Sequence, residues 1–284
     1  MVKHRILKLL CFIFIIAFFD VLLLERLYDR TIDIKPIPLS ALEKVVPVEK
    51  IASFQIPNEA IEEIKRYCET ERKDFIQFFS AYMAYNDFQL KDVSYDFNQP
   101  YYDEVKYPAA IEKIYEMLLK DVVCFPIPQD SNKNTNAYYF NNSWKAQRTY
   151  GGDRPHYGTD IMDAENENGR IPIVSMTNGY IEKIGWLELG GWRIGIRAEH
   201  GGYFYYAHMD GYADHMFEGK VIKAGDVIGY MGDTGYGEEG TRGQFPVHLH
   251  LGIALPANEA LEEFWINPYW LLNYIEETKV TIHE

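Results

Sequence analysis

The sequence contains little cysteine and has no excess of basic residues. Three cysteines are present among 284 residues, and no Cys-x-x-Cys pair occurs. Three are too few for a disulfide framework, and the state of Cys68 and Cys124 stays open. Lysine and arginine number 28 against 42 acidic residues, which gives a formal net charge of −14. Because basic surface drives binding to nucleic acids, we expect no nucleic-acid partner.

Long hydrophobic runs are also missing, apart from one at the N-terminus. Leu9–Phe19 comprises eleven apolar residues behind a basic head, and no small-x-small cleavage site follows. A basic head before such a run is typical of a secretory signal. We therefore predict an uncleaved signal anchor within residues 1–30, with the basic head in the cytoplasm and the rest of the chain outside the membrane. A cleaved signal peptide, which would leave a secreted protein, and a buried helix remain the alternatives.

The composition changes three times along the rest of the chain. Residues 31–54 carry three prolines and mixed charge, which predicts a linker. Residues 55–123 repeat apolar residues at i, i+3 and i+4, as in Ala60, Ile61, Ile64 and Cys68, which predicts a small helical domain. Prolines and a polar run predict a second linker over 124–136. The helical stripes indicate packing, and the segment offers no chemistry of its own.

Residues 137–284 consist of short alternating runs separated by glycine pairs. Short strands with turn signals about every 8–12 residues predict an all-β sandwich or barrel-like sheet, so the chain as a whole is α+β. The predicted strands are Ile171–Val174, Gly179–Trp186, Trp192–Ala198, Tyr203–His208 and Val227–Met231. The apolar and aromatic residues of 258–276 predict a helical tail that covers one edge of the sheet.

Three short motifs in this region carry chemistry. They are His156-x-x-x-Asp160, the run Tyr205-Tyr206-Ala207-His208, and His248-x-His250 within an apolar run. Because side chains alternate along a strand, His248 and His250 should share one face while Leu249 and Leu251 enter the core. The same rule places Phe204, Tyr206 and His208 together. Two histidines and one carboxylate are a usual ligand set for catalytic zinc, although a lone His-x-His is more often a surface pair.

Taken together, the motifs resemble the M23 family of zinc metallopeptidases, the lysostaphin and LytM type. The resemblance covers roughly residues 137–255 and includes the segments Val174–Gly179, Val221–Gly229 and Met231–Gly235 between the histidine motifs. It implies an antiparallel sheet with a groove and one Zn²⁺ per chain, bound by His156, Asp160 and His250. It also implies catalytic roles for His208 and His248 in hydrolysing a peptide bond of bacterial peptidoglycan, in the stem or the cross-bridge. Tyr157, Tyr206 and Trp186 are candidates for lining the groove.

Two other interpretations remain open at this point. The first is a non-catalytic scaffold or binding protein of the cell envelope, in which the helical domain docks a protein partner. The second is a latent enzyme whose metal site is blocked by the N-terminal region or by a loop near Asn141 and Asn142. The complete set of five histidine and aspartate residues favours an active metalloendopeptidase, because a scaffold has no need to keep it.

Overall fold

The computed structural model describes residues 35–90, 96–97, 109–130, 137–258, 260 and 262–282. Residues 35–284 belong to one compact unit, separate from residues 1–34. The predicted signal anchor lies outside the described residues and stays a prediction. Within the described ranges, no helix combines the length and the apolar character needed to cross a membrane.

The segment predicted as the first linker is folded wherever the structure describes it. It contains α2 (Leu39–Leu42) and α3 (Val48–Ser53). The Ile37 amide donates to the Pro256 carbonyl at 2.8 Å, and Ile37, Ile51 and Phe54 are at most 1% exposed. The linker prediction is therefore wrong for residues 35–54. Prolines suggested an open chain, but burial of the apolar residues between them fixes the segment against the sheet.

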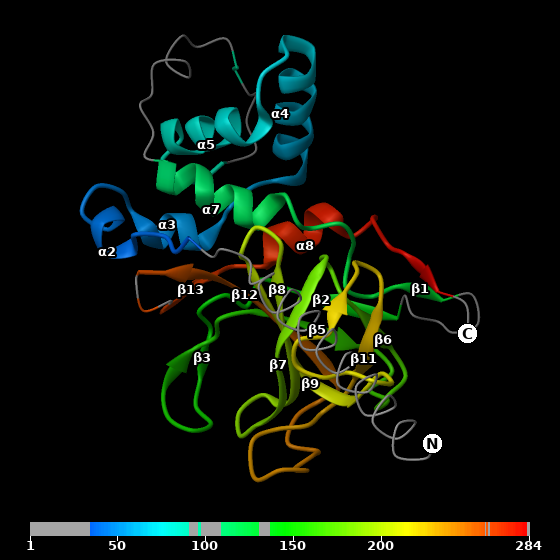
Figure 1. Ribbon diagram of the computed structural model, residues 1–284. Coiled ribbons are helices and arrows are strands. Elements are labelled where there is room, and N and C mark those ends of the chain that lie inside the picture. Colours follow the sequence, from blue (N-terminus) through cyan, green and yellow to red (C-terminus); the bar gives the residue numbers. More distant parts are fainter. Residues whose placement is uncertain are drawn as a thin grey trace, which may run out of the picture. The chain divides into compact units, whose positions relative to one another are not determined.

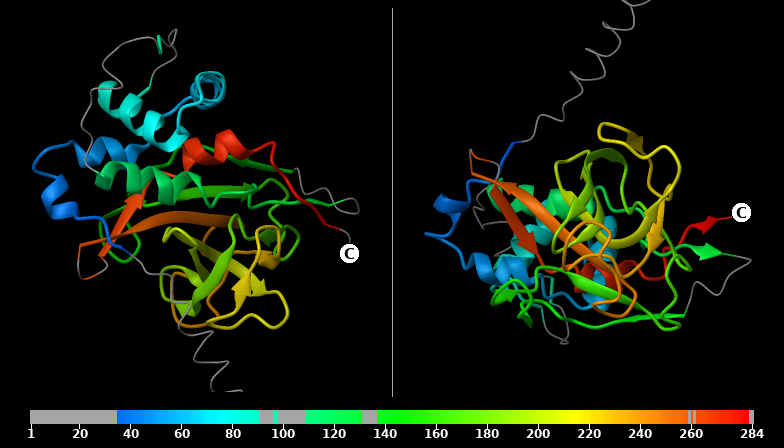
Figure 2. Two further views of the ribbon diagram at one scale, coloured as in Figure 1. Left: turned by 45° about the horizontal axis from the view of Figure 1, so that its top comes forward. Right: turned by 90° about the horizontal axis from the view of Figure 1, so that it is seen from below.

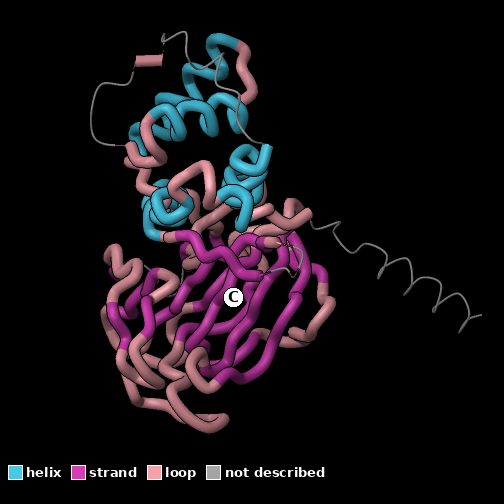
Figure 3. Tube along the Cα trace, turned by 90° about the vertical axis from the view of Figure 1, so that its left-hand side faces the viewer, coloured by secondary structure: helices cyan, strands magenta, loops and turns pink. Residues whose placement is uncertain are grey.

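Three longer helices follow, and the helical prediction is confirmed for them. They are α4 (Asn58–Glu71), α5 (Phe75–Tyr85) and α7 (Ala109–Leu119). The stripe predicted for α4 is buried, α5 and α7 also bury apolar residues, and the rings of Phe79 and Tyr115 meet edge to face at 5.0 Å. Figures 1 and 3 show these helices gathered on one side of the strand-rich part of the molecule.

The helical region and the sheet share one continuous core. The connection between them, predicted as a linker over 124–136, is buried at Cys124, Phe125 and Ile127. It also forms β1 (Gln129–Asp130), which pairs in parallel with β14 (Thr281–Ile282). The second linker prediction is thus wrong for residues 124–130, whereas residues 131–136 are not described.

Ten strands among the described residues form one sheet, in which all the pairings are antiparallel. The main order is β10-β7-β8-β9-β12-β5-β2, with β11 beside β6 and β9, and β13 beside β12. β3 and β4 form a separate hairpin. The strands are β2 (Tyr138–Phe140), β3 (Gln147–Arg148), β4 (Arg154–Pro155), β5 (Thr159–Asp163), β6 (Pro172–Val174), β7 (Gly179–Leu187), β8 (Gly191–Ala198), β9 (Tyr203–Tyr212), β10 (Val221–Ile222), β11 (Val227–Met231), β12 (His248–Ala257) and β13 (Glu262–Ile266).

The C-terminal tail is only partly helical. A helix, α8 (Tyr269–Ile275), is present, but β13 occupies the first half of the predicted tail and pairs with β12. Figure 2 shows these two strands, both in orange, as a long hairpin that extends toward the blue helices α2 and α3. The prediction was wrong for 262–266 because the ladder with β12 supplies hydrogen bonds that outweigh the weak local helical pattern.

Two central strands position the site, and one of them breaks the expected alternation. In β12, Leu249 and Leu251 are fully buried while His248 and His250 lie on the opposite face, as predicted. In β9, Phe204 and Tyr206 are also fully buried. His208 adopts a left-handed backbone with φ of 61°, and the pairing between β8 and β9 shifts register beside it. This bulge turns His208 away from the face of Tyr206, so the predicted grouping of those residues is wrong.

Candidate functional site

Three side chains converge where β5 meets β12. Asp160 and His250 are paired directly across these strands, and His156 follows the end of β4. The Nε2 atom of His156 lies 3.1 Å from Oδ1 of Asp160 and 2.9 Å from Nδ1 of His250. The Nδ1 atom of His250 lies 3.0 Å from the same Asp160 oxygen. These three atoms form a compact triangle, and within the described residues they are the group suited to hold a metal.

The triangle fits a small divalent cation. Around a tetrahedral Zn²⁺ with bonds of 2.0–2.1 Å, neighbouring donor atoms are about 3.3 Å apart, close to the separations observed here. The Nδ1–H of His156 donates to the Ser143 carbonyl at 3.1 Å, which leaves the lone pair of Nε2 directed at the other two donors. A carboxylate and imidazole nitrogens facing one another in this way are the hard and borderline donors that zinc prefers.

Arg148 contacts the second oxygen of the Asp160 carboxylate. Its Nη2 atom lies 2.5 Å from Oδ2, so the guanidinium of β3 holds the carboxylate from the side opposite the histidines. Burial of Asp160 alone would raise its pKa, but the close contacts of its carboxylate with the rings of His156 and His250 outweigh burial and keep the pKa of Asp160 well below its usual range. The carboxylate is therefore ionised, as a metal ligand must be.

His208 and His248 lie beside this cluster with their rings 4.7 Å apart. The Nδ1–H of His208 donates to the Thr234 carbonyl and that of His248 to the Pro246 carbonyl, both at 2.7 Å. Because a carbonyl can only accept, each ring has its Nε2 lone pair free to act on a ligand. Burial lowers the pKa of both histidines, so both are neutral near pH 7.

Gly158 shows how closely the backbone approaches the cluster. A Cβ atom at this position would lie 2.5 Å from Cε1 of His250 and 2.7 Å from the carbonyl oxygen of Leu251. Any side chain would therefore push the His250 ring out of place. Glycine between His156 and Asp160 is thus required by the packing of a histidine that lies about ninety residues further along the chain.

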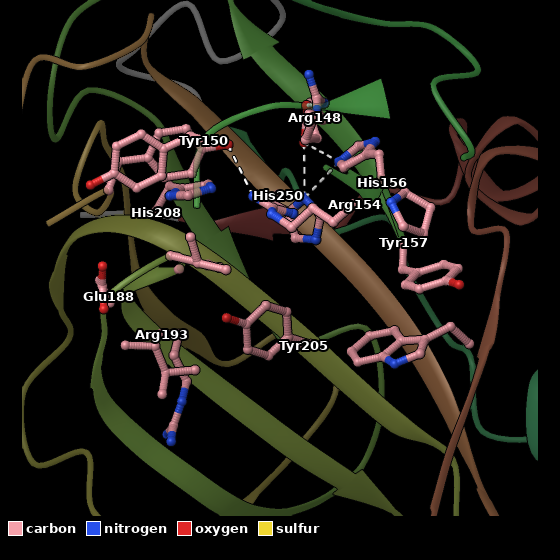
Figure 4. Close-up of a pocket in the computed structure, with 18 of the residues that line it drawn as sticks. Arg148, Tyr150, Arg154, His156, Tyr157, Glu188, Arg193, Tyr205, His208 and His250 are labelled. Atoms are coloured by element: carbon pink, nitrogen blue, oxygen red, sulfur yellow. Dashed lines mark hydrogen bonds and ion pairs between the residues drawn. The ribbon is translucent and has the colours of Figure 1, made fainter. Parts of the chain in front are cut away.

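The cluster opens into a pocket of about 1030 Å³. Figure 4 shows the pocket with Arg148 and His156 on one side and Tyr205, Arg193 and Glu188 on the other. All five predicted residues line it: His156, Asp160, His208, His248 and His250. Tyr157 lines it as expected, but Trp186 does not, and Tyr206 is buried beneath the sheet, where its hydroxyl accepts from the Met176 amide.

Several lining residues were not anticipated from the sequence. Arg148 lies on a two-residue strand with no motif, and Trp265 lies in the segment predicted as a helical tail. Tyr205 and Arg193 could have been found, since both alternate with buried residues of predicted strands. The alternation rule identifies their face but gives no sign of which face borders the histidines.

The chain is similar in sequence to known peptidases. The profile described as Peptidase family M23 matches residues 154–261. An L-Ala–D-Glu endopeptidase of Bacillus subtilis (strain 168) is 40% identical over 129 residues, which are 45% of this chain and 37% of that protein. Lysostaphin of Staphylococcus simulans is 34% identical over 83 residues, which are 28% of this chain and 16% of lysostaphin. The chain thus spans well under half the length of these curated relatives.

A solved structure extends the likeness beyond the sheet. A protein from Ruminococcus gnavus ATCC 29149, assigned as a glycyl-glycine endopeptidase lytM, is 39% identical in sequence, with a TM-score of 0.69. The match covers 82% of this chain and 93% of that protein's structure. A match over so much of the chain reaches past residues 137–284, so part of the helical region belongs to the shared architecture.

Proposed function

The chain belongs to peptidase family M23, and from this premise we propose that it is a zinc-dependent endopeptidase acting on bacterial peptidoglycan. The bond hydrolysed would be a peptide bond of the stem or the cross-bridge. The observation that carries the proposal is the meeting of three metal-ligating atoms with two neutral histidines in one open pocket.

His156, Asp160 and His250 would hold one Zn²⁺ per chain through the three atoms that already face one another. When bound, zinc lowers the pKa of water and polarises the scissile carbonyl. The second contact of each ligand limits how it can rotate: Ser143 holds His156, Arg148 holds Asp160, and the missing side chain of Gly158 makes room for His250. Such outer contacts orient ligands and strengthen metal binding.

His208 and His248 would carry out the proton transfers. Both are neutral with Nε2 unprotonated, so each is equipped to accept the proton of an attacking water. A ring that has accepted this proton becomes an Nε2–H donor, which can stabilise the developing oxyanion or protonate the leaving amine. Asp160 lies 3.8 Å from Nε2 of His248, and its negative charge favours the imidazolium while it lasts.

Catalysis by this chain is better supported than a scaffold or a latent form. All five residues are in place, and Arg148 rather than an asparagine contacts the cluster. The Oδ1 atom of Asn142 instead accepts from the Trp144 amide and the Asn267 side chain, so it does not act on the metal ligands. Docking of a partner on the helical region stays a prediction. The proposed substrate lies outside the cytoplasmic membrane, so we propose that residues 1–30 direct export and anchor the chain there.

The test combines metal analysis with digestion of peptidoglycan. We expect about one zinc per chain and new peptide termini, identified by mass spectrometry, that chelation abolishes. His250→Ala should lose both zinc and cleavage, whereas His208→Gln should keep zinc and lose roughly 10²–10⁴ in kcat. If His250→Ala keeps wild-type zinc content and cleavage, the proposal is wrong. Bound zinc without any cleavage by the wild-type chain would favour a scaffold or a latent enzyme.

A further inference from the structure

One of the arginines of the pocket, Arg193, lies on the row of residues that contains the metal-ligating cluster. Asp160 of β5 pairs with His250 of β12, and His250 pairs with Ala207 of β9. On the next strand, β8, Arg193 lies between Trp192, the partner of Met209, and Ile194, the partner of Tyr206. Arg193 is thus in line with Ala207 and His250. The row runs across the sheet from the cluster to a guanidinium.

The Arg193 side chain belongs to the pocket face of β8. Its neighbour Ile194 is fully buried in the core, so alternation directs Arg193 to the other face, where it lines the pocket. In Figure 4 it lies with Tyr205 on the side of the pocket opposite Arg148. Between Arg193 and the cluster lie Ala207, which carries only a methyl group, and the ring of Tyr205, whose centroid is 6.0 Å from that of His250.

The charge of Arg193 is not compensated among the described residues. No ion pair joins it to an acidic side chain, and its buried Nη1 atom has no hydrogen-bond partner. Glu188 and Glu263 also line the pocket, but neither forms an ion pair with it. The neighbouring Arg197 shows the contrast, since it pairs with Glu182 at 2.5 Å. A buried donor on a charged group needs an acceptor, and a carboxylate in the pocket would supply one.

Two phenols beside Arg193 add further donors. Tyr203 and Tyr205 line the same side of the pocket, and within the described ranges neither hydroxyl has a hydrogen-bond partner. Burial raises the pKa of Tyr203 to about 12 although Arg193 opposes this, so the phenol is protonated and can donate. A Cβ atom on Gly195 would lie 1.8 Å from the Tyr203 hydroxyl, which shows that glycine leaves the space this ring occupies.

We propose that Arg193, with Tyr203 and Tyr205, binds a free carboxylate of the substrate peptide and so selects acidic over amidated peptides. Two strand spacings separate Arg193 from His250, about 10 Å, and an extended peptide advances about 3.3 Å per residue. The carboxylate therefore belongs to a residue within about three positions of the scissile bond. A guanidinium recognises a carboxylate through two parallel hydrogen bonds, which a carboxamide cannot accept in the same way. This inference rests on the proposed function, because it names the substrate class of that pocket.

The experiment uses two synthetic stem peptides that differ only at one glutamyl residue, whose α-carboxyl group is free in one and a carboxamide in the other. We expect the zinc-loaded wild type to cleave the acidic peptide with a kcat/KM about ten- to a hundredfold higher. Arg193→Gln should reduce this ratio to near one, and Arg193→Lys should keep part of it, since lysine retains the charge but not the planar fork.

Lys183→Gln is the matched control. Lys183 lines the same pocket and pairs with Gly195 across β7 and β8, but it is exposed. Removing it changes the net charge equally, and we expect the acid preference to persist. An equal loss of preference in Lys183→Gln would mean that diffuse charge, rather than a site at Arg193, selects the peptide. That result would overturn the proposal.

Calorimetric binding of both peptides to zinc-free protein separates this proposal from the proposed function. Tighter binding of the acidic peptide that depends on Arg193 supports the site even if no peptide is cleaved, an outcome that would defeat the peptidase proposal alone. Cleavage of both peptides at equal rates, with equal affinities, would defeat the carboxylate site and leave the peptidase proposal standing. A thermal unfolding midpoint within a few degrees of wild type establishes that each variant is folded.

Discussion

Two carboxylates of β5, three residues apart, have opposite surroundings. Asp163 is 4% exposed and accepts hydrogen bonds from the amides of Glu165 and Glu167 at 2.9 and 3.0 Å, and from the Arg170 guanidinium. Asp160 faces ring nitrogens of His156 and His250, which themselves face each other, and it has a single arginine contact. Asp163 is satisfied by the chain itself, whereas the Asp160 cluster brings together groups that all have lone pairs to share.

The difference separates a structural carboxylate from a functional one without reference to any motif. Donors that match every acceptor indicate a group that stabilises the fold. Acceptors that converge indicate a group that binds a cation, because a cation is what removes their mutual repulsion. Both carboxylates can lie on one strand because side chains alternate along it, so residues 160 and 163 face opposite sides. Asp160, near the connection from β4, lies in the pocket, and Asp163 lies beneath the turn that follows β5.

The largest effect should come from Asp160→Asn. An amide supplies a weaker and neutral ligand, so zinc binding should fall below stoichiometric levels. Cleavage should drop by roughly 10⁴-fold or more, as the several kcal/mol of charge stabilisation that a metal gives are lost. Zinc analysis and initial rates of peptidoglycan digestion measure this. In chelator, the unfolding midpoint of Asp160→Asn should lie closer to wild type than that of Asp163→Asn. The reverse order would contradict a zinc-binding role for Asp160 and a structural role for Asp163.

Asp163→Asn should act on stability instead. Neutralising Asp163 leaves the Arg170 guanidinium, whose side chain is 9% exposed, with only Glu165 as an acidic partner, and weakening a buried pair in this way should cost up to about 3–5 kcal/mol. Urea unfolding in chelator measures the change. The folded fraction should still bind zinc with wild-type affinity. A variant with unchanged stability and lost zinc would show that Asp163, and not only Asp160, serves the site.

Of the two carboxylates, only Asp160 could be assigned a role from the sequence. Spacing from His156 and resemblance to a family marked Asp160, and the apolar residues of β12 correctly predicted the face of His248 and His250. Nothing local marked Asp163, because its main partner, Arg170, lies beyond a turn that only the folded chain closes. The contact of Arg148 with Asp160 is likewise invisible before the β3–β4 hairpin is in place.

The mistaken predictions share a physical cause. His208 was assigned to the face of Tyr206 by a strict alternation, and a single left-handed residue reverses that assignment without changing the pattern of apolar residues. The stretch 35–54 was predicted as a linker from its prolines, but Ile37 and Ile51 are buried by partners from β12, β13 and the helices. Backbone bulges and long-range burial are properties of the assembled fold, so neither can be read from local composition.

Removing the arginine partner of each carboxylate in turn tests the difference between Asp160 and Asp163 further. Arg148→Gln should weaken zinc binding about 10–100-fold, as removal of an outer partner of a ligand typically does. Stability should change by less than about 1 kcal/mol, because the Arg148 side chain is 32% exposed. Arg170→Gln should do the opposite and destabilise the fold with little effect on zinc. Competition with a chromogenic chelator gives the zinc affinities. Equal effects of the two variants on zinc affinity and stability would contradict the separate roles of Asp160 and Asp163.

The smallest effect is a pH dependence of stability in zinc-free protein to which the structural carboxylate, Asp163, should contribute. Burial would raise the pKa of Asp163, but hydrogen bonds from Arg170 and from two backbone amides outweigh it and lower the pKa. A carboxyl group with a lowered folded-state pKa stabilises the fold above its unfolded pKa, about 3.9, and this contribution is lost as the pH falls through the folded value. The unfolding free energy of wild type should therefore fall as acid is added below about pH 4. Asp163→Asn starts less stable but should lose less over the same interval, since its side chain does not titrate. Chemical denaturation between pH 3 and 6 in chelator measures the slope of the unfolding free energy against pH for wild type, Asp163→Asn and Asp160→Asn. Equal slopes for wild type and Asp163→Asn would mean that the Asp163–Arg170 pair does not make stability depend on pH.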